Sequence, residues 1–186
     1  HYGTTGFLPT LISTSFEVMR QAIAAVNQAI AEGVPGILGI HLEGPFLNAQ
    51  RKGIHDAGKF CPLDEEGFEI VTSLQAGTTL VTLAPELTSP ELIRRLVQAG
   101  VVVCAGHSDA NYSQTRAALM AGVAGFTHLY NAMTPLQSRE PGMVGAALED
   151  DTVPAPDLVT GPSAQGRELD TVHEDAPGVG PDEAEE

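Results

Sequence analysis

One carboxylate and two imidazoles draw attention because each lies at the end of a short apolar segment. Glu43 ends the run 36–43, His107 ends the run 101–107, and His128 lies near the end of the run 124–130. One glutamate and two neutral histidines suit a divalent metal, and three protein ligands leave one coordination position open for water. Such a metal lowers the pKa of that water and polarises a carbonyl group. These residue types therefore predict a catalytic metal site, with zinc or iron(II) as the expected cation.

The spacing of these residues is too long for a local motif, so a second interpretation stays open. In it, His107 and His128 are ordinary strand-end histidines bonded to backbone groups. Glu43 is harder to explain in that way, because a carboxylate inside a buried strand end needs a partner. His41 lies deeper in the same segment, so we expect it to form hydrogen bonds behind the site or in the core. For Glu86, in "VTLAPE", we likewise expect a supporting carboxylate.

The body of the chain alternates apolar segments with segments of helical periodicity, which predicts a parallel sheet with crossover helices. An open doubly wound sheet and a (β/α)8 barrel both fit this rhythm. In either fold the carboxyl ends of the strands converge on one edge, where barrels carry their chemistry. The expected strands lie within 5–13, 36–43, 78–86, 101–107 and 124–130, and the expected helices within 15–32, 63–76, 89–100 and 112–122.

Alternation of side chains along a strand makes further predictions about faces. It places His107 on the same face as Val103, and His128 on the same face as Phe126. Cys104 then faces the opposite way, toward the helices, where we expect a small core residue.

Charge and composition exclude several classes of function. The chain has 186 residues, 42% of them hydrophobic, and a net charge of −15, which argues against nucleic-acid and anionic-membrane partners. No apolar run approaches the length of a transmembrane helix, and the opening "HYGTTGFLPT" does not resemble a signal peptide. The two cysteines, Cys61 and Cys104, have unlike contexts. We therefore expect reduced thiols and a cytoplasmic protein.

The last part of the chain has a different composition. Ten of the 24 acidic side chains and one of the nine basic ones lie in 151–186, so that residues 1–150 carry a net charge of −6. The segment is rich in Pro and Gly and lacks Ile, Phe and Tyr. We expect a partial barrel over 1–150 and a disordered acidic tail over 151–186.

Several motifs resemble the N-acetylglucosamine-6-phosphate deacetylases, a family of the amidohydrolase superfamily of metal-dependent (β/α)8 barrels. The resemblance implies hydrolysis of the acetamide of N-acetylglucosamine 6-phosphate to glucosamine 6-phosphate and acetate, a step of amino-sugar catabolism. It also leaves a homodimer possible, because the family tends to form dimers. The match follows the family's order across nearly all of 1–150. Its motifs are "GIHLEGPFLNAQRKGIH" (39–55), "VTLAPE" (81–86), "AGHSDANY" (105–112) and "THLYNAMTPLQSREPGMVGAAL" (127–148).

The resemblance also implies roles for individual residues. It makes Arg139 a contact of the phosphorylated sugar, which suits a fixed guanidinium and a dianion. The alternatives for Arg139 are an ion pair with Glu140 or a solvated charge in a loop, and the alternative for His55 is a plain surface position. The implied metal ligands are Glu43, His107 and His128, and the implied substrate-binding residues are Ile54, His55, Asn131, Ala132 and Arg139.

The chain also departs from the family pattern. The family's general acid–base aspartate comes from a strand later than those recognised here, and in the faint echo "DLVTGP" (157–162) Gly161 stands at its place. We therefore nominate no catalytic acid or base. The alternative function is a catalytically incomplete fragment that retains metal and sugar-phosphate binding. A weaker alternative is an amidohydrolase acting on a cyclic amide, against which Arg139 and the "YNAM" loop argue.

Overall fold

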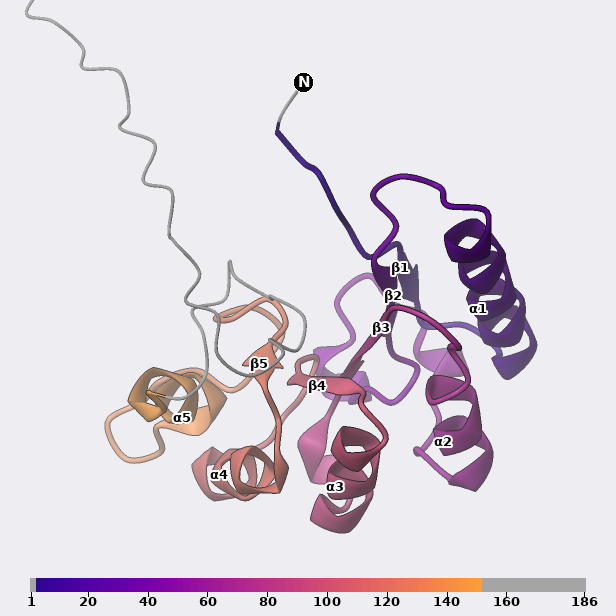
Figure 1. Cartoon of the computed structure of the whole chain (residues 1–186). Helices are drawn as coiled ribbons and strands as arrows, with labels where there is room; N and C mark the ends of the chain where they lie inside the picture. Colours follow the sequence, from indigo (N-terminus) through magenta and orange to yellow (C-terminus); the bar gives the residue numbers. More distant parts are fainter. Residues whose placement is uncertain (1–2, 152–186) are drawn as a thin grey trace, which may run out of the picture.

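The computed structural model describes residues 3–151, which form five parallel strands flanked by helices (Figure 1). The predicted parallel sheet with crossover helices is confirmed. The tail expected over 151–186 lies, apart from its first residue, outside the described residues. The strands are β1 (Thr10–Ile12), β2 (Gly39–Glu43), β3 (Thr78–Leu83), β4 (Val102–Ala105) and β5 (Gly125–Phe126).

The strands are hydrogen-bonded in chain order, β1-β2-β3-β4-β5. A doubly wound sheet reverses its strand order at a switch point and carries helices on both faces. Here the order never reverses, and the side chains of the sheet that pack with the helices all belong to one face. This arrangement selects the barrel type over the doubly wound sheet.

The described residues also form five α-helices and three short 3-10 turns, of which α5 follows the last strand. Four of the helices fall within the predicted helical segments, whereas α5 was not predicted, because "GMVGAALE" is apolar all round and shows no amphipathic period. None of the helices in 3–151 is long and apolar enough to cross a bilayer. The elements are α1 (Phe16–Ala31), α2 (Glu65–Val71), α3 (Pro90–Gln98), α4 (Tyr112–Ala121), α5 (Gly142–Glu149), η1 (Ala49–Arg51), η2 (Ala57–Lys59) and η3 (Pro85–Leu87).

Local signals fix where these helices begin and end. The side chains of Ser15 and Ser89 accept hydrogen bonds from the first-turn amides of α1 and α3, and Pro90 occupies the first position of α3. Asn111 begins α4 with a capping box. The same helix ends at Gly122, whose φ of 108° suits a residue without a side chain.

The helix-facing side of the sheet forms the main core. Leu42 and Val81, both fully buried, pack there with residues of α1 to α4. A second, smaller cluster joins Leu80, Val102 and Cys104 to Leu8. Because Leu80 and Val81 are consecutive strand residues, the smaller cluster lies on the face turned away from the helices.

The predictions about Cys104, His107 and His128 need correction. Cys104 is a small buried residue as expected, but it belongs to the cluster on the face opposite the helices. His107 and His128 do not continue the faces of Val103 and Phe126, which both pack in the main core. The reason is that each histidine follows its strand in a left-handed conformation, with φ of 47° and 57°. Strand alternation therefore ends before either imidazole is reached.

Candidate metal site

The candidate site lies at the carboxyl edge of the sheet. Glu43 is the last residue of β2, in register with Ile12 of β1 and Thr82 of β3. His107 comes two residues after β4, and His128 comes two residues after β5. Because the strands are parallel, all three segments end at the same edge, as the sequence predicted.

One oxygen of Glu43 is the meeting point of three imidazoles. Its Oε1 lies 3.0 Å from Nε2 of His107, 2.9 Å from Nε2 of His128 and 3.5 Å from Nε2 of His55. The ring of His107 packs edge-on against His128, with centroids 5.5 Å apart. The structure therefore brings together the three residues predicted as metal ligands and adds His55 to them. Glu43, His55 and His107 lie within reach of a single metal ion.

The hydrogen bonds of His107 fit a metal ligand. Its Nδ1 lies 2.8 Å from the carbonyl oxygen of Arg51, which can only accept, so Nδ1 carries the proton. In the neutral imidazole the lone pair is then on Nε2, which points at Glu43. A lone pair facing a carboxylate is unfavourable unless a proton or a cation lies between them. A carbonyl that orients the remote nitrogen in this way is typical of metal-bound histidine. The donor set present therefore fits a divalent cation.

His55 is held in a different way. It is 3% exposed, so the alternative of a plain surface histidine is wrong. Its Nδ1 lies 2.8 Å from Oγ of Ser13 and 3.3 Å from the amide nitrogen of the same residue. Ser13 was missed in the sequence. It follows β1 directly, so the rule that drew attention to Glu43, a polar residue at a strand end, would have found it.

The cluster shifts the pKa values of its members in opposite directions. Hydrogen bonding from His107, opposed by burial and assisted by His128, lowers the pKa of Glu43 to about 2. Burial lowers the pKa of His107, but hydrogen bonds to Glu43 and to the carbonyl of Arg51 outweigh it, and the net shift is upward. Burial, followed by the charge of His107, lowers the pKa of His55. The site thus stabilises an ionised carboxylate and a neutral His55.

His41 lies one layer below this cluster and is not part of it. Its Nδ1 is 3.1 Å from Oγ1 of Thr10 and its Nε2 is 2.8 Å from Oγ1 of Thr82. Thr82 in turn lies 2.7 Å from Oγ1 of Thr127. Burial lowers the pKa of His41. This bonding supports the expectation that His41 is a hydrogen-bonder behind the site.

Glu86 joins the loops that carry the site. Its Oε1 accepts from Nδ2 of Asn48 (2.8 Å) and from the amide of Asp109 (2.6 Å), and its Oε2 accepts from Oγ of Ser108 (2.5 Å). The backbone N–H of Asn48 also donates a hydrogen bond to the backbone carbonyl of His107, at 2.9 Å. The carboxylate therefore fixes the turn in which His107 has its left-handed conformation, as expected of a supporting residue.

The residues predicted to bind the substrate lie in two loops at the same edge. Ile54, beside His55, is 90% exposed. Asn131 and Ala132 follow His128 within three and four residues, and the carbonyl of Ala132 accepts from the amide of Ser108. The loop after β5 is thereby tied to the loop after β4.

Arg139 occupies an exposed position in the loop that leads to α5. Glu140 accepts hydrogen bonds from the amides of Tyr112 and Gly142 and forms no ion pair with Arg139 in the described part of the chain. The described residues therefore lack that ion pair, and the exposed position of Arg139 agrees with a solvated loop charge as well as with a phosphate contact.

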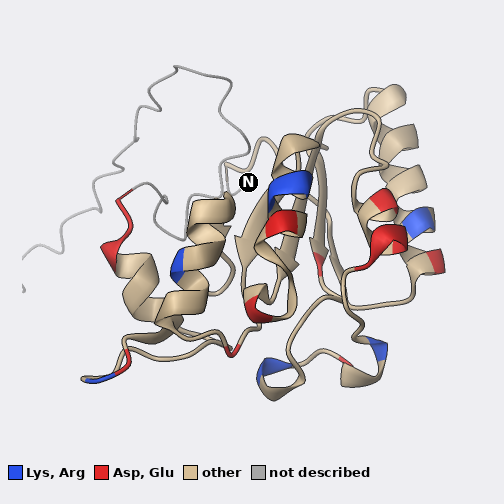
Figure 2. Ribbon diagram, turned by 90° about the horizontal axis from the view of Figure 1, so that it is seen from below, with Lys and Arg blue, Asp and Glu red and all other residues tan. Residues whose placement is uncertain are grey.

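Whether a basic side chain forms an ion pair differs between the α-helices and the loops. Every arginine on an α-helix of the described part forms an ion pair, for example Arg20 with Glu66. Within 3–151 three basic residues form none, and all three lie in the loops after β2 and β5: Lys52, Lys59 and Arg139. Figure 2 shows that both the helices and the loops carry acidic as well as basic positions. The basic side chains without an ion pair among the described residues thus all lie at the edge that carries the site.

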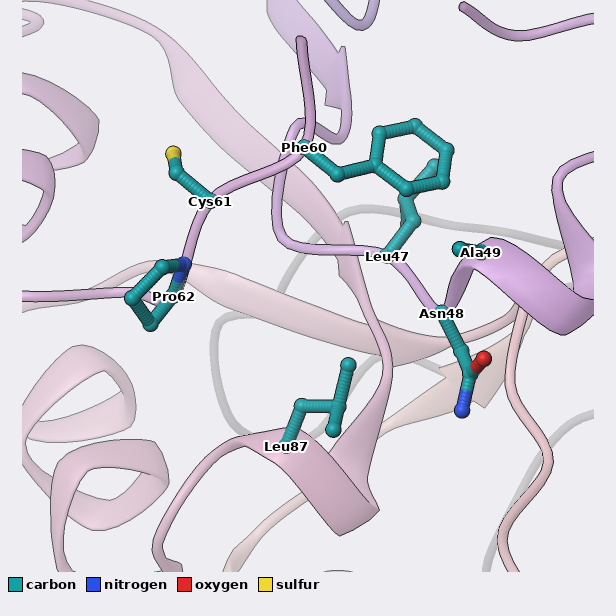
Figure 3. Close-up of a pocket in the computed structure, with 7 residues that line it drawn as sticks. All are labelled: Leu47, Asn48, Ala49, Phe60, Cys61, Pro62 and Leu87. Carbon is teal, nitrogen blue, oxygen red and sulfur yellow. The ribbon is translucent and has the colours of Figure 1, made fainter. Parts of the chain in front are cut away.

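An apolar pocket of about 420 Å³ lies beside these loops and is distinct from the imidazole cluster (Figure 3). No imidazole or carboxylate of the described residues lines it, so these residues do not offer the chemistry described above. Its lining residues are Leu47, Asn48, Ala49, Phe60, Cys61, Pro62 and Leu87.

Comparison with known proteins places this site in context. No family model matches the chain. An N-acetylgalactosamine-6-phosphate deacetylase of Shewanella sp. (strain ANA-3) is 46% identical over 150 residues, which are 81% of this chain and 38% of that protein. The N-acetylglucosamine-6-phosphate deacetylase of Bos taurus is 37% identical over 161 residues, 83% of this chain and 39% of its own length.

The solved structures agree. A mutant N-acetyl-D-glucosamine-6-phosphate deacetylase of Mycobacterium smegmatis, in complex with N-acetyl-D-glucosamine-6-phosphate, is 37% identical with a TM-score of 0.76; the match covers 82% of this chain and 40% of that one. The chain therefore spans about two fifths of the length of the relatives it matches. Its motifs, its parallel sheet and these similarities together show that the chain belongs to the N-acetylglucosamine-6-phosphate deacetylase family, whose barrel type it shares.

Proposed function

We propose that this chain is part of a metal-dependent deacetylase that hydrolyses the acetamide of N-acetylglucosamine 6-phosphate. The observation that carries the proposal is the convergence of His107 and His128 on one oxygen of Glu43. The relatives named above support the substrate class.

Glu43, His107 and His128 would hold the metal, and their carboxylate and imidazole donors suit zinc or iron(II). When bound, such a cation supplies an activated water and polarises the amide carbonyl. The contribution of this chain is to hold the ligands in place. Glu43 stays ionised because its pKa is low, and the carbonyl of Arg51 keeps Nε2 of His107 directed into the site.

The uncompensated basic side chains support an anionic substrate. A sugar phosphate is a dianion, and Lys52, Lys59 and Arg139 surround the loops of this edge without a carboxylate partner in the described residues. We assign Arg139 to the phosphate, because its guanidinium can bind two phosphate oxygens at once. Ile54, His55, Asn131 and Ala132 would line the sugar.

A binding protein without turnover is the second candidate. The observation that favours it is that, within 3–151, no residue matches the general acid–base aspartate that the resemblance places on a later strand. General acid–base catalysis contributes about 10²–10⁴ in rate, so a chain that lacks that group would bind substrate and release acetate very slowly.

One assay separates the two candidates. The purified 186-residue chain, loaded with zinc or iron(II), is incubated with the 6-phosphates of N-acetylglucosamine and N-acetylgalactosamine and with unphosphorylated N-acetylglucosamine. The deacetylase proposal predicts acetate release from a phosphorylated sugar only. Binding of the sugar phosphate without acetate release would overturn it for this chain and support the second candidate. Equal release from the unphosphorylated sugar would refute the role of Arg139.

Compartment and assembly are proposals of the same kind. Cys61 and Cys104 are both free, which supports a reducing, cytoplasmic setting. A homodimer is the assembly we propose to test, by sedimentation of the purified chain at several concentrations. A mass that stays at one chain throughout would reject it.

A further inference from the structure

Among residues 3–151, Ser13 is the one that forms hydrogen bonds with Nδ1 of His55. It lies at the end of β1, is 8% exposed, and reaches His55 across 42 residues of sequence. Both its hydroxyl and its backbone amide approach Nδ1, at 2.8 Å and 3.3 Å.

The backbone amide decides which nitrogen of His55 carries the proton. An amide N–H can only donate, so Nδ1 must accept, and the proton of the neutral ring is then on Nε2. In the other tautomer two N–H groups would face each other, and the buried amide of Ser13 would lose its acceptor. The hydroxyl of Ser13 can add a second donated hydrogen bond to the same nitrogen.

His55 and His107 are therefore held in opposite tautomers. The carbonyl of Arg51 places the proton of His107 on Nδ1 and leaves Nε2 free as a ligand. Ser13 places the proton of His55 on Nε2, which lies 3.5 Å from Oε1 of Glu43. A protonated nitrogen cannot ligate a metal, so the proximity of His55 to the other two does not make it a ligand.

Gly44 provides the space that this contact needs. A Cβ at that position would lie 2.2 Å from the Ser13 hydroxyl, and the φ of 91° disfavours any residue with a side chain. The chain after β2 thus passes Ser13 at a distance that only glycine permits.

The geometry points to Ser13 as a positioning residue: it fixes His55 as an N–H donor directed into the site and keeps it out of the metal coordination. This inference rests on the proposed function at one point: the group that the Nε2–H of His55 faces is taken to be an oxygen of the bound amino-sugar phosphate. The tautomer itself is a property of the metal-free chain.

The test is nuclear magnetic resonance of the metal-free 186-residue chain labelled with ¹⁵N-histidine, with the His55 signals assigned by their absence in His55→Gln. We expect the Nε2–H tautomer in the unmodified chain. In Ser13→Ala the lost hydroxyl bond raises the ratio of the Nδ1–H to the Nε2–H form about fivefold, the equivalent of one net hydrogen bond. Ser13→Thr, which keeps hydroxyl and amide, retains the original ratio.

Two results would overturn the inference. One is an Nδ1–H tautomer of His55 in the unmodified chain, which needs no variant to fold. The other is a folded Ser13→Ala chain, recognised by unchanged His107 signals, whose His55 ratio equals that of the unmodified chain. Neither depends on acetate release, so failure of the proposed function and failure of this inference remain distinguishable.

Discussion

Replacement of Glu43 by glutamine tests the electrostatics of the cluster in the absence of any metal. The change removes the charge and keeps the size and an oxygen acceptor. Glu43 has a pKa of about 2 in the folded chain, against 4.5 for an unperturbed glutamate, chiefly because metal-free His107, when protonated on both ring nitrogens, donates a hydrogen bond from Nε2 to its carboxylate. A carboxylate whose pKa is depressed by folding stabilises the folded state at pH values above its unfolded pKa. That stabilisation is lost as the pH falls toward the folded pKa.

The size of the effect follows from the shift. Each pKa unit corresponds to 1.36 kcal/mol, so the ionised carboxylate contributes about 3 kcal/mol to the free energy of unfolding at pH 5.5. At pH 3, between the two pKa values, linkage leaves less than half of this, about 1.4 kcal/mol. Below pH 2 the contribution disappears. At both pH values the histidines of the unfolded chain are largely protonated, so they add little to the pH dependence of the unfolded state.

Urea unfolding of the original chain and of Glu43→Gln at pH 5.5 and pH 3 measures this difference directly. Glu69→Gln is the control, because Glu69 is an exposed carboxylate that forms no ion pair in the described part of the chain. We expect the variant to lose about 3 kcal/mol at pH 5.5 and clearly less at pH 3, while the control changes little. A loss that is small at both pH values, or equal at both, would refute the reasoning about the cluster.

Three further predictions concern other parts of the described chain. Gly44→Ala should lower the free energy of unfolding by about 1–3 kcal/mol, because its Cβ would collide with the Ser13 hydroxyl; an unchanged urea midpoint would contradict this. Iodoacetamide at pH 8 should label the half-buried Cys61 well before Cys104, whose burial raises its pKa to about 12; mass spectrometry would count against this if both thiols reacted at the same rate. Arg139→Ala should weaken binding of N-acetylglucosamine 6-phosphate at least about tenfold, and leave unphosphorylated N-acetylglucosamine unaffected, in calorimetric titrations; equal weakening of both would remove Arg139 from the phosphate site.

Much of what the sequence predicted follows from one rule, that polar residues at the carboxyl ends of parallel strands lie at one edge of the sheet. Periodicity located the five strands and four of the five α-helices, and the convergence of parallel strand ends brought Glu43, His107 and His128 together before any distance was known. The order of the strands in the sheet could not be predicted from the alternation of strand and helix segments alone. It became clear only from the pairing of each strand with the next, which no local pattern encodes.

The errors have local physical causes. Cys104 was assigned to the wrong face because the alternation was counted back from His107, which follows a left-handed turn and no longer belongs to the strand. The two opposed tautomers of His55 and His107 depend on Ser13 and on the carbonyl of Arg51, both distant in sequence. Such long-range hydrogen bonds leave no periodic signal. Ser13 could still have been found, because it ends β1 as Glu43 ends β2.

Zinc binding to the 186-residue chain is the most direct measurement of the central claim that Glu43, His107 and His128 hold a divalent cation. Equilibrium dialysis followed by metal analysis would compare the original chain with a variant in which all three residues are replaced by alanine, and with His55→Ala as the matched control. The account predicts about one zinc per chain for the original protein and for the control, and none at this site for the triple variant. Equal zinc content in the original chain and the triple variant would contradict it.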